Sequence, residues 1–99
     1  MLIDGKKIVM GDREFVMPPA PLGILRRHSE VFEGGKAASM SVMADVVLAA
    51  LQRNYPELTQ EEFETKYLDI GNVGLAFRTV MMVSGVEEGL SGERLPGDR

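Results

Sequence analysis

Two short runs of β-prone, mostly apolar residues flank a polar Gly-Asp pair near the N-terminus, and they predict a β-hairpin over residues 6–17. The stretch reads KKIVMGDREFVM, with β-prone residues on both sides of Gly11-Asp12. Glycine at the first position of a two-residue connection is typical of a tight hairpin turn, and this turn sets Ile8 opposite Phe15. Side chains alternate along a strand, so four apolar side chains share one face of the predicted hairpin: Ile8, Met10, Phe15 and Met17. An isolated hairpin is marginally stable in water, so this face must pack on helices or on another chain.

After Pro18, the apolar spacing changes to a helical period and predicts four helices, at about residues 22–32, 39–54, 60–68 and 73–84. The first has an apolar stripe interrupted by one serine: Leu22, Leu25, Ser29 and Phe32. In the third, two aromatic residues four positions apart are expected to stack on each other: Phe63 and Tyr67. The second and fourth are apolar on almost their whole circumference, as is typical of helices covered on all sides.

Residues that favour helix ends mark the predicted boundaries. Either Ser39 or Ser41 can cap the second helix, and Thr-x-x-Glu at residues 59–62 forms a capping box for the third. Asn72 is the expected cap of the fourth helix, and Gly85 closes it. These signals predict a mainly α (α+β) fold: one domain at residues 1–86, in which a hairpin precedes a compact bundle of about four helices. Residues 87–99 have the composition of a disordered tail.

Length and charge limit the possible functions. The chain has 99 residues, which suits one small domain, and its formal net charge of −4 argues against a surface that binds phosphates. It contains no cysteine, so a disulfide framework or thiolate zinc site is impossible. The N-terminus does not resemble a secretory signal, and no apolar run reaches the ~20 residues of a membrane span. We therefore expect a cytoplasmic protein that binds neither membranes nor nucleic acid.

No motif indicates catalysis, a cofactor or a metal. His28 is the only histidine, and its neighbour Ser29 does not face it on a helix, so no nucleophile–base pair is visible. Gly34-Gly35-Lys36 is similar to the end of a phosphate-binding loop, but Ala37 stands where serine or threonine is required. We expect no catalytic, cofactor-binding or metal-binding residues and therefore a protein that is not an enzyme.

The third and fourth predicted helices have the outline of a helix-turn-helix unit, which leaves a small regulatory or antitoxin-like DNA-binding protein as one alternative. Its recognition helix would be NVGLAFRTVMMVSG, in which Arg78 is the only cation. Reading a major groove needs polar residues at the helix N-terminus and cations or amides that reach phosphates. Helix packing is therefore the favoured explanation of this outline.

The two apolar helices leave two interpretations open: they form the centre of a compact core, or another protein covers part of their surface. Seven methionines favour the second, because methionine recurs at surfaces that accept varied partners. Phe77 and Met81 form one row on the fourth helix, and Met82 with Arg78 forms the next. Both rows cannot easily face one small core, since they lie about 100° apart on the helix. The expected partner-binding residues are those rows together with two from the second helix: Phe77, Arg78, Met81, Met82, Val47 and Leu51.

Two segments resemble one protein family. They are the run Pro18–Arg27, PPAPLGILRR, and the block 46–85, in which LQRNYPELT precedes LDIGN and VSG closes the last helix. In this order, the chain resembles the tail assembly chaperones of long-tailed bacteriophages and prophages. The resemblance covers most of residues 6–86, and its motifs are caps, turns and apolar spacing.

The resemblance implies a non-enzymatic role in the cytoplasm of a bacterial host. Members of this family bind the long, helical tape-measure protein while the tail is built, keep it soluble and help recruit tail-tube subunits. The same order of features is also compatible with a minor structural subunit of the virion, and with a homo-oligomer. Purified particles would contain such a subunit, whereas a chaperone would leave.

Overall fold

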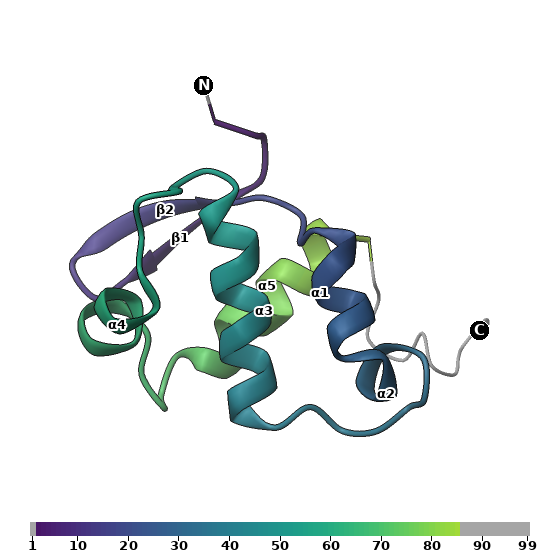
Figure 1. Ribbon diagram of the computed structural model, residues 1–99. Helices are drawn as coiled ribbons and strands as arrows, with labels where there is room; N and C mark the ends of the chain where they lie inside the picture. The colour runs from purple at the N-terminus through teal and green to yellow at the C-terminus, as the bar shows by residue number, and fades with distance from the viewer. Residues whose placement is uncertain (1, 86–99) are drawn as a thin grey trace, which may run out of the picture.

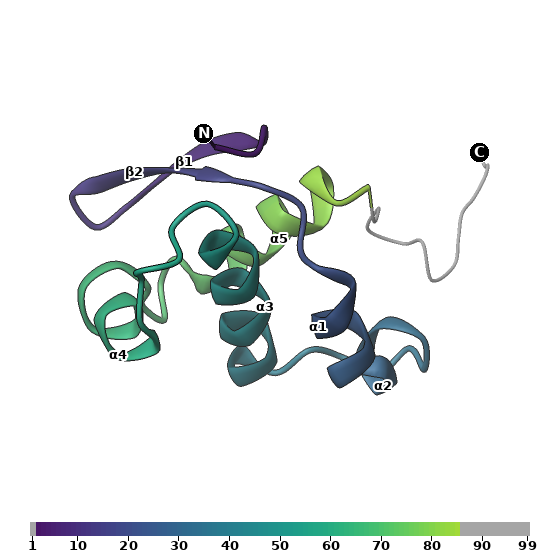
Figure 2. The same cartoon turned by 45° about the horizontal axis from the view of Figure 1, so that its top comes forward.

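The computed structural model describes residues 2–85, which form an N-terminal β-hairpin followed by helices, the α+β class that the sequence predicts. The elements, in chain order, are β1 (Lys6–Met10), β2 (Arg13–Met17), α1 (Leu22–Arg27), α2 (Ser29–Phe32), α3 (Met40–Gln52), α4 (Gln60–Glu62), the π-helix η1 (Phe63–Tyr67) and α5 (Val73–Val83). Helices α3 and α5 pack against each other at the centre, with α4 on one side and α1 and α2 on the other (Figure 1). The hairpin lies across one end of this layer of helices, over α3 and α4 (Figure 2). The predicted tail at 87–99 lies outside the described residues.

The hairpin has the predicted register. Ile8 pairs with Phe15, and the two residues of the turn begin with Gly11 at a φ of 64°. All four side chains of the predicted inner face are buried, whereas Val9 on the outer face is 65% exposed. The position of the turn therefore predicted the pairing, and with it the face that packs on the helices.

The predicted helix at 22–32 is wrong as a continuous element. The backbone leaves the helical region at His28, with φ −118° and ψ 45°, so that α1 and α2 are separate. The predicted stripe fails with it, because Ile24 is the buried residue of α1 and Leu22 is 64% exposed. Because the chain changes direction at His28, Phe32 of α2 packs against the core although it does not share a helix face with Ile24, the buried residue of α1.

The predicted helix at 60–68 begins as expected and then widens. The side-chain oxygen of Thr59 accepts a hydrogen bond from the Glu62 amide at 3.1 Å, which is one half of the predicted capping box. From residue 63, the backbone forms a π-turn, in which the Leu68 amide donates to the Phe63 carbonyl at 2.8 Å. A π-turn moves positions four apart off a common row. Phe63 and Tyr67 consequently each pack edge-on against Phe15, with ring centroids 6.4 and 5.2 Å from it, in place of the predicted stacking on each other.

The ends of the two central helices match the prediction except at one cap. Ser39 caps α3 by accepting a hydrogen bond from the Val42 amide at 3.2 Å, and Gly85, with a φ of 83°, follows α5. The predicted cap Asn72 makes no side-chain bond to α5. Its side-chain oxygen instead accepts from the Asp69 amide at 2.8 Å, so it holds the turn before the helix rather than the helix itself.

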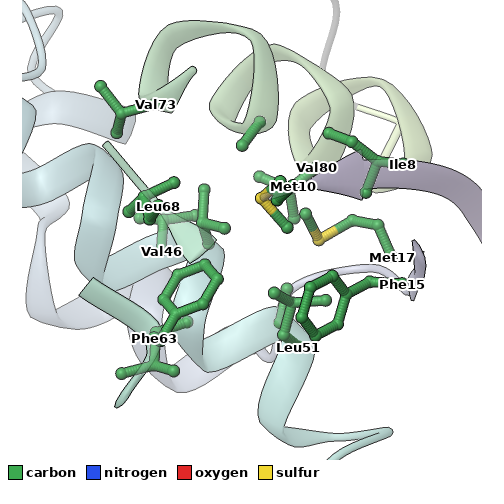
Figure 3. Close-up of a cluster of buried hydrophobic side chains, with 14 of the residues drawn as sticks. Ile8, Met10, Phe15, Met17, Val46, Leu51, Phe63, Leu68, Val73 and Val80 are labelled. Atoms are coloured by element: carbon green, nitrogen blue, oxygen red, sulfur yellow. The ribbon is translucent and has the colours of Figure 1, made fainter. Parts of the chain in front are cut away.

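One continuous core joins the hairpin to the helices. Figure 3 shows the inward side chains of the hairpin between α5 and α3, with Met10 near Val80 of α5 and Phe15 beside Leu51 of α3. Most of the residues drawn there are less than 7% exposed. Burial of apolar side chains is the main favourable term in folding, so this cluster fixes how α3 and α5 lie relative to the hairpin.

Candidate functional site

The structure separates the expected partner-binding residues into three groups. Val47 and Leu51 are fully buried, so they belong to the core and offer no surface to a partner. Phe77 and Met81 are half-buried and pack against the core. The last two, Arg78 and Met82, are exposed. Another protein can therefore contact the expected residues of α5 but not Val47 and Leu51 of α3.

Helix α5 turns one face to the core and the opposite face to solvent. Its buried side consists of Val73, Ala76, Thr79 and Val80. The outward side carries Leu75 and Met82, which are 54% and 57% exposed and lie seven positions apart, hence on one stripe. The row of Phe77 and Met81 lies between the two sides. The two predicted rows are thus distinct, and the one that contains Met82 points away from the core.

An apolar groove lies between α5 and the pair α1–α2. It has a volume of about 200 Å³ and is lined almost entirely by apolar side chains: Ala20, Pro21, Leu22, Ile24, Leu25, Phe32, Met81 and Ser84. Its volume is below the roughly 300–1,000 Å³ of sites for drug-sized ligands, so it suits one or two side chains of another protein better than a cofactor. The exposure of Leu22 shows that the described part of the chain leaves the groove open.

Contacts at both ends hold the groove in shape. At one end, the Ala20 amide donates a hydrogen bond to the Ser84 hydroxyl at 3.0 Å, which joins the start of α1 to the end of α5. At the other end, the rings of Phe32 and Phe77 lie 6.5 Å apart at an angle of 41°. The expected partner residue Phe77 therefore packs against Phe32, which lines the groove, whereas Met81 lines the groove itself.

A second hollow, of about 320 Å³, continues over the outer side of α1 and α2. It shares Leu22 and Leu25 with the groove and adds Arg26, Ser29 and Glu33. Three arginines near these helices, Arg26, Arg27 and Arg78, form no ion pair with any of residues 2–85. Of the three, Arg26 lines the second hollow, next to the apolar groove, and carries a charge that no carboxylate of residues 2–85 pairs with.

His28 has a structural position rather than a catalytic one. Its Nε2 atom lies 3.2 Å from the Asp45 carboxylate of α3, close enough for an ion pair, although the geometry is not that of a hydrogen bond. Ser29 is exposed and points into the second hollow. The contact joins the break between α1 and α2 to α3, which places the groove-lining helices on the body of the domain.

The described residues contain no group of three or more histidine, aspartate or glutamate side chains that could hold a metal ion. Among the same residues, none of the helices has both the length and the apolar character needed to cross a membrane. Acidic side chains gather in the segment 57–69, and the outward face of α5 presents Arg78 as its single cation.

No protein-family model matches the chain, and neither a curated protein nor a solved structure matches it.

The sequence did not predict the groove, because Leu22, Leu25 and Phe32 were assigned to one apolar stripe of a continuous helix and only Met81 of the lining residues was expected to bind a partner. One signal was present: Ile24 and Leu25 are adjacent, so α1 has apolar residues on more than one narrow stripe. A short helix with a wider apolar surface than its packing uses is the pattern that indicates such a groove.

Proposed function

We propose that this protein is a non-enzymatic assembly chaperone for the tail of a long-tailed bacteriophage or prophage. Its client is the helical tape-measure protein, which it keeps soluble until tail-tube subunits assemble around it. The observation that carries the proposal is the open apolar groove between α1–α2 and α5, together with the outward row of α5. The resemblance of residues 6–86 to tail assembly chaperones supports the same function.

The groove gives this function a physical basis. A tape-measure protein presents amphipathic helices whose apolar stripes must stay covered before assembly. A groove between helices receives such a stripe through side chains spaced at i, i+3, i+4 and i+7. Met81 in the wall and Met82 beside it adapt to stripes of different shape, because methionine is unbranched and flexible. Binding of this kind requires no catalytic group.

Co-expression with the tape-measure protein of the same phage genome tests the proposal. The wild-type chain should keep the client in the soluble fraction. Leu22→Asp should lower the soluble client several-fold, because it places a carboxylate in the wall of the groove. Val9→Asp is the matched control: Val9 is 65% exposed, against 64% for Leu22, but it lies on the outer face of the hairpin.

Circular dichroism should show that both variants fold. If the wild-type chain leaves the client insoluble, the chaperone function is refuted. If Leu22→Asp protects the client as well as Val9→Asp does, the binding surface lies outside the groove. Detection of the chain as a constant component of purified particles would instead indicate a virion subunit.

A further inference from the structure

Charge at the rim of the groove indicates which helices it accepts. Arg26 lines the hollow beside the groove and follows Leu22 by four positions, so it lies on the same stripe of α1. On the opposite wall, Arg78 precedes Met81 by three positions and is exposed. Each of the two walls thus carries one arginine, three or four positions from a residue that lines the groove.

The nearest negative charges do not neutralise this rim. Glu33 lines the second hollow seven positions beyond Arg26, and the neighbouring Glu30 lies 3.7 Å from the Lys36 ammonium. Neither Arg26 nor Arg78 has a carboxylate within 4.0 Å among residues 2–85. Counted over residues 2–85, the rim therefore carries two positive charges against one negative charge, although the whole chain has a net charge of −4.

We infer that the groove selects an amphipathic helix whose apolar stripe is bordered by aspartate or glutamate on both sides. The apolar side chains enter the space between Leu22, Leu25 and Met81, and the flanking carboxylates pair with Arg26 and Arg78. Arginine suits this role because its planar group can bind a carboxylate with two parallel hydrogen bonds. The inference rests on the proposed function in one respect: it takes this helix to be a segment of the tape-measure protein.

A second copy of the chain fits the groove less well. The exposed apolar stripe that another copy offers is that of α5, where Arg78 lies between Leu75 and Met82. Docking that stripe would bring an arginine against the two arginines of the rim, and like charges held close together oppose binding. An acidic border on the bound helix removes this conflict.

Two labelled synthetic helices with the same leucine stripe test the inference by fluorescence anisotropy. One carries glutamate at the positions that border the stripe, and the other carries lysine. At low salt, the wild-type chain should bind the glutamate peptide about tenfold more tightly, since each exposed charge pair contributes modestly. The preference should shrink at about 1 M salt, where the screening length falls to roughly 3 Å.

Charge-reversal variants identify the residues responsible. The double variant Arg26→Glu/Arg78→Glu should prefer the lysine peptide. Arg27→Glu should retain the wild-type preference, because Arg27 lines neither the groove nor the second hollow. The neutral pair Arg26→Gln/Arg78→Gln should abolish the preference, and it remains informative if the reversed pair does not fold.

Equal binding of both peptides by the wild-type chain would overturn the inference, and so would a glutamate preference that persists in the neutral pair. A stable dimer that excludes both peptides in analytical ultracentrifugation would assign the groove to a second copy instead. These outcomes are distinct from failure of the chaperone function. If the wild-type chain shows no charge preference but still keeps the tape-measure protein soluble, only the acidic border of the bound helix is refuted. If it prefers the glutamate peptide but does not keep the tape-measure protein soluble, the tape-measure protein is refuted as the client.

Discussion

The two ends of this domain differ in how completely they are closed. At the hairpin end, Phe15 is fully buried and lies edge-on to three aromatic rings, those of Tyr55, Phe63 and Tyr67. The guanidinium of Arg13 lies over the same cluster, 4.6 Å from the centre of the Phe15 ring. Cation–π and edge-to-face contacts of this kind add to the energy of burial.

Side-chain hydrogen bonds also tie the hairpin to the loop after α3. The Val16 amide donates to the hydroxyl of Tyr55 at 2.8 Å, and the side-chain amide of Asn54 donates to the Val16 carbonyl at 3.0 Å. The other end, where α1 and α2 meet α5, has the single bond from Ala20 to Ser84 and a pair of tilted phenylalanine rings. That end also keeps Leu22 and Met82 largely exposed.

The two ends differ in the position of their exposed apolar residues: Val9 at the hairpin end is as exposed as Leu22, but only Leu22 of the two lines the groove. A domain of this length buries roughly 60–65% of the surface of its unfolded chain, so its stability depends on using apolar residues well. The hairpin end does so, because Phe15 and Phe63 are both fully buried there. The groove end leaves leucine and methionine in solvent, as expected of a surface that another protein covers.

The largest expected effect of a substitution is at the closed end. Phe15→Ala should lower the free energy of unfolding by about 3–5 kcal/mol, because it opens a cavity among three aromatic rings. Leu22→Ala should change it by less than about 0.5 kcal/mol, since Leu22 is 64% exposed. Urea denaturation of both variants measures the contrast. Similar losses in the two variants would show that the ends are equally packed.

The turn of the hairpin offers a second contrast between the ends. A β-carbon on Gly11 would lie 2.8 Å from the Lys66 carbonyl oxygen, whereas one on Gly35, between α2 and α3, would meet open space. Both glycines have positive φ, so alanine costs about 1–2 kcal/mol at either position. Gly11→Ala should cost at least about 1 kcal/mol more than Gly35→Ala, because crowding adds to backbone strain. Equal shifts in thermal unfolding would mean that the turn does not press on η1.

These two regions also show what the sequence could predict. The position of the Gly11-Asp12 turn between two β-prone runs was sufficient to predict the register of the hairpin, and the register gave its buried face. Those features depend on neighbouring residues alone, and so does the Ser39 cap of α3. Local signals were therefore sufficient for these features, although the equally local cap predicted at Asn72 was wrong.

The breaks in the predicted helices depend on distant contacts. No proline or glycine interrupts residues 24–32, and the break at His28 coincides with its contact to Asp45 of α3. The π-turn of η1 likewise places Tyr67 against Phe15, more than fifty residues earlier in the chain. On α5, apolar residues occupy most of the circumference, so periodicity could not choose the outward face. The groove depends on the first and the third of these arrangements, because α1, α2 and α5 line it.

A smaller effect is expected from removing one hydroxyl group. Tyr55→Phe should reduce the free energy of unfolding by about 1 kcal/mol, because the Val16 amide loses its acceptor. Tyr67→Phe is the matched control, since the Tyr67 hydroxyl makes no hydrogen bond within residues 2–85 and its ring packs on the same phenylalanine. Chemical denaturation measures the free energy of unfolding of both variants. A larger loss for Tyr67→Phe would contradict the role assigned to the bond between Tyr55 and Val16.

The smallest effect on stability is expected at Met82, on the open end. Met82→Asp should change the free energy of unfolding by less than about 0.5 kcal/mol, because the side chain is 57% exposed and points away from the core. The same variant should lower the yield of soluble tape-measure protein in co-expression, because a carboxylate beside Met81 disfavours an apolar stripe. Phe77→Asp gives the opposite kind of result: it removes a ring that packs on Phe32 and should destabilise the fold itself. If Met82→Asp unfolds the chain, the outward row of α5 contributes to the core. If it folds and protects the client fully, the client binds only in the groove that Leu22 and Met81 line, and the binding surface does not extend to Met82.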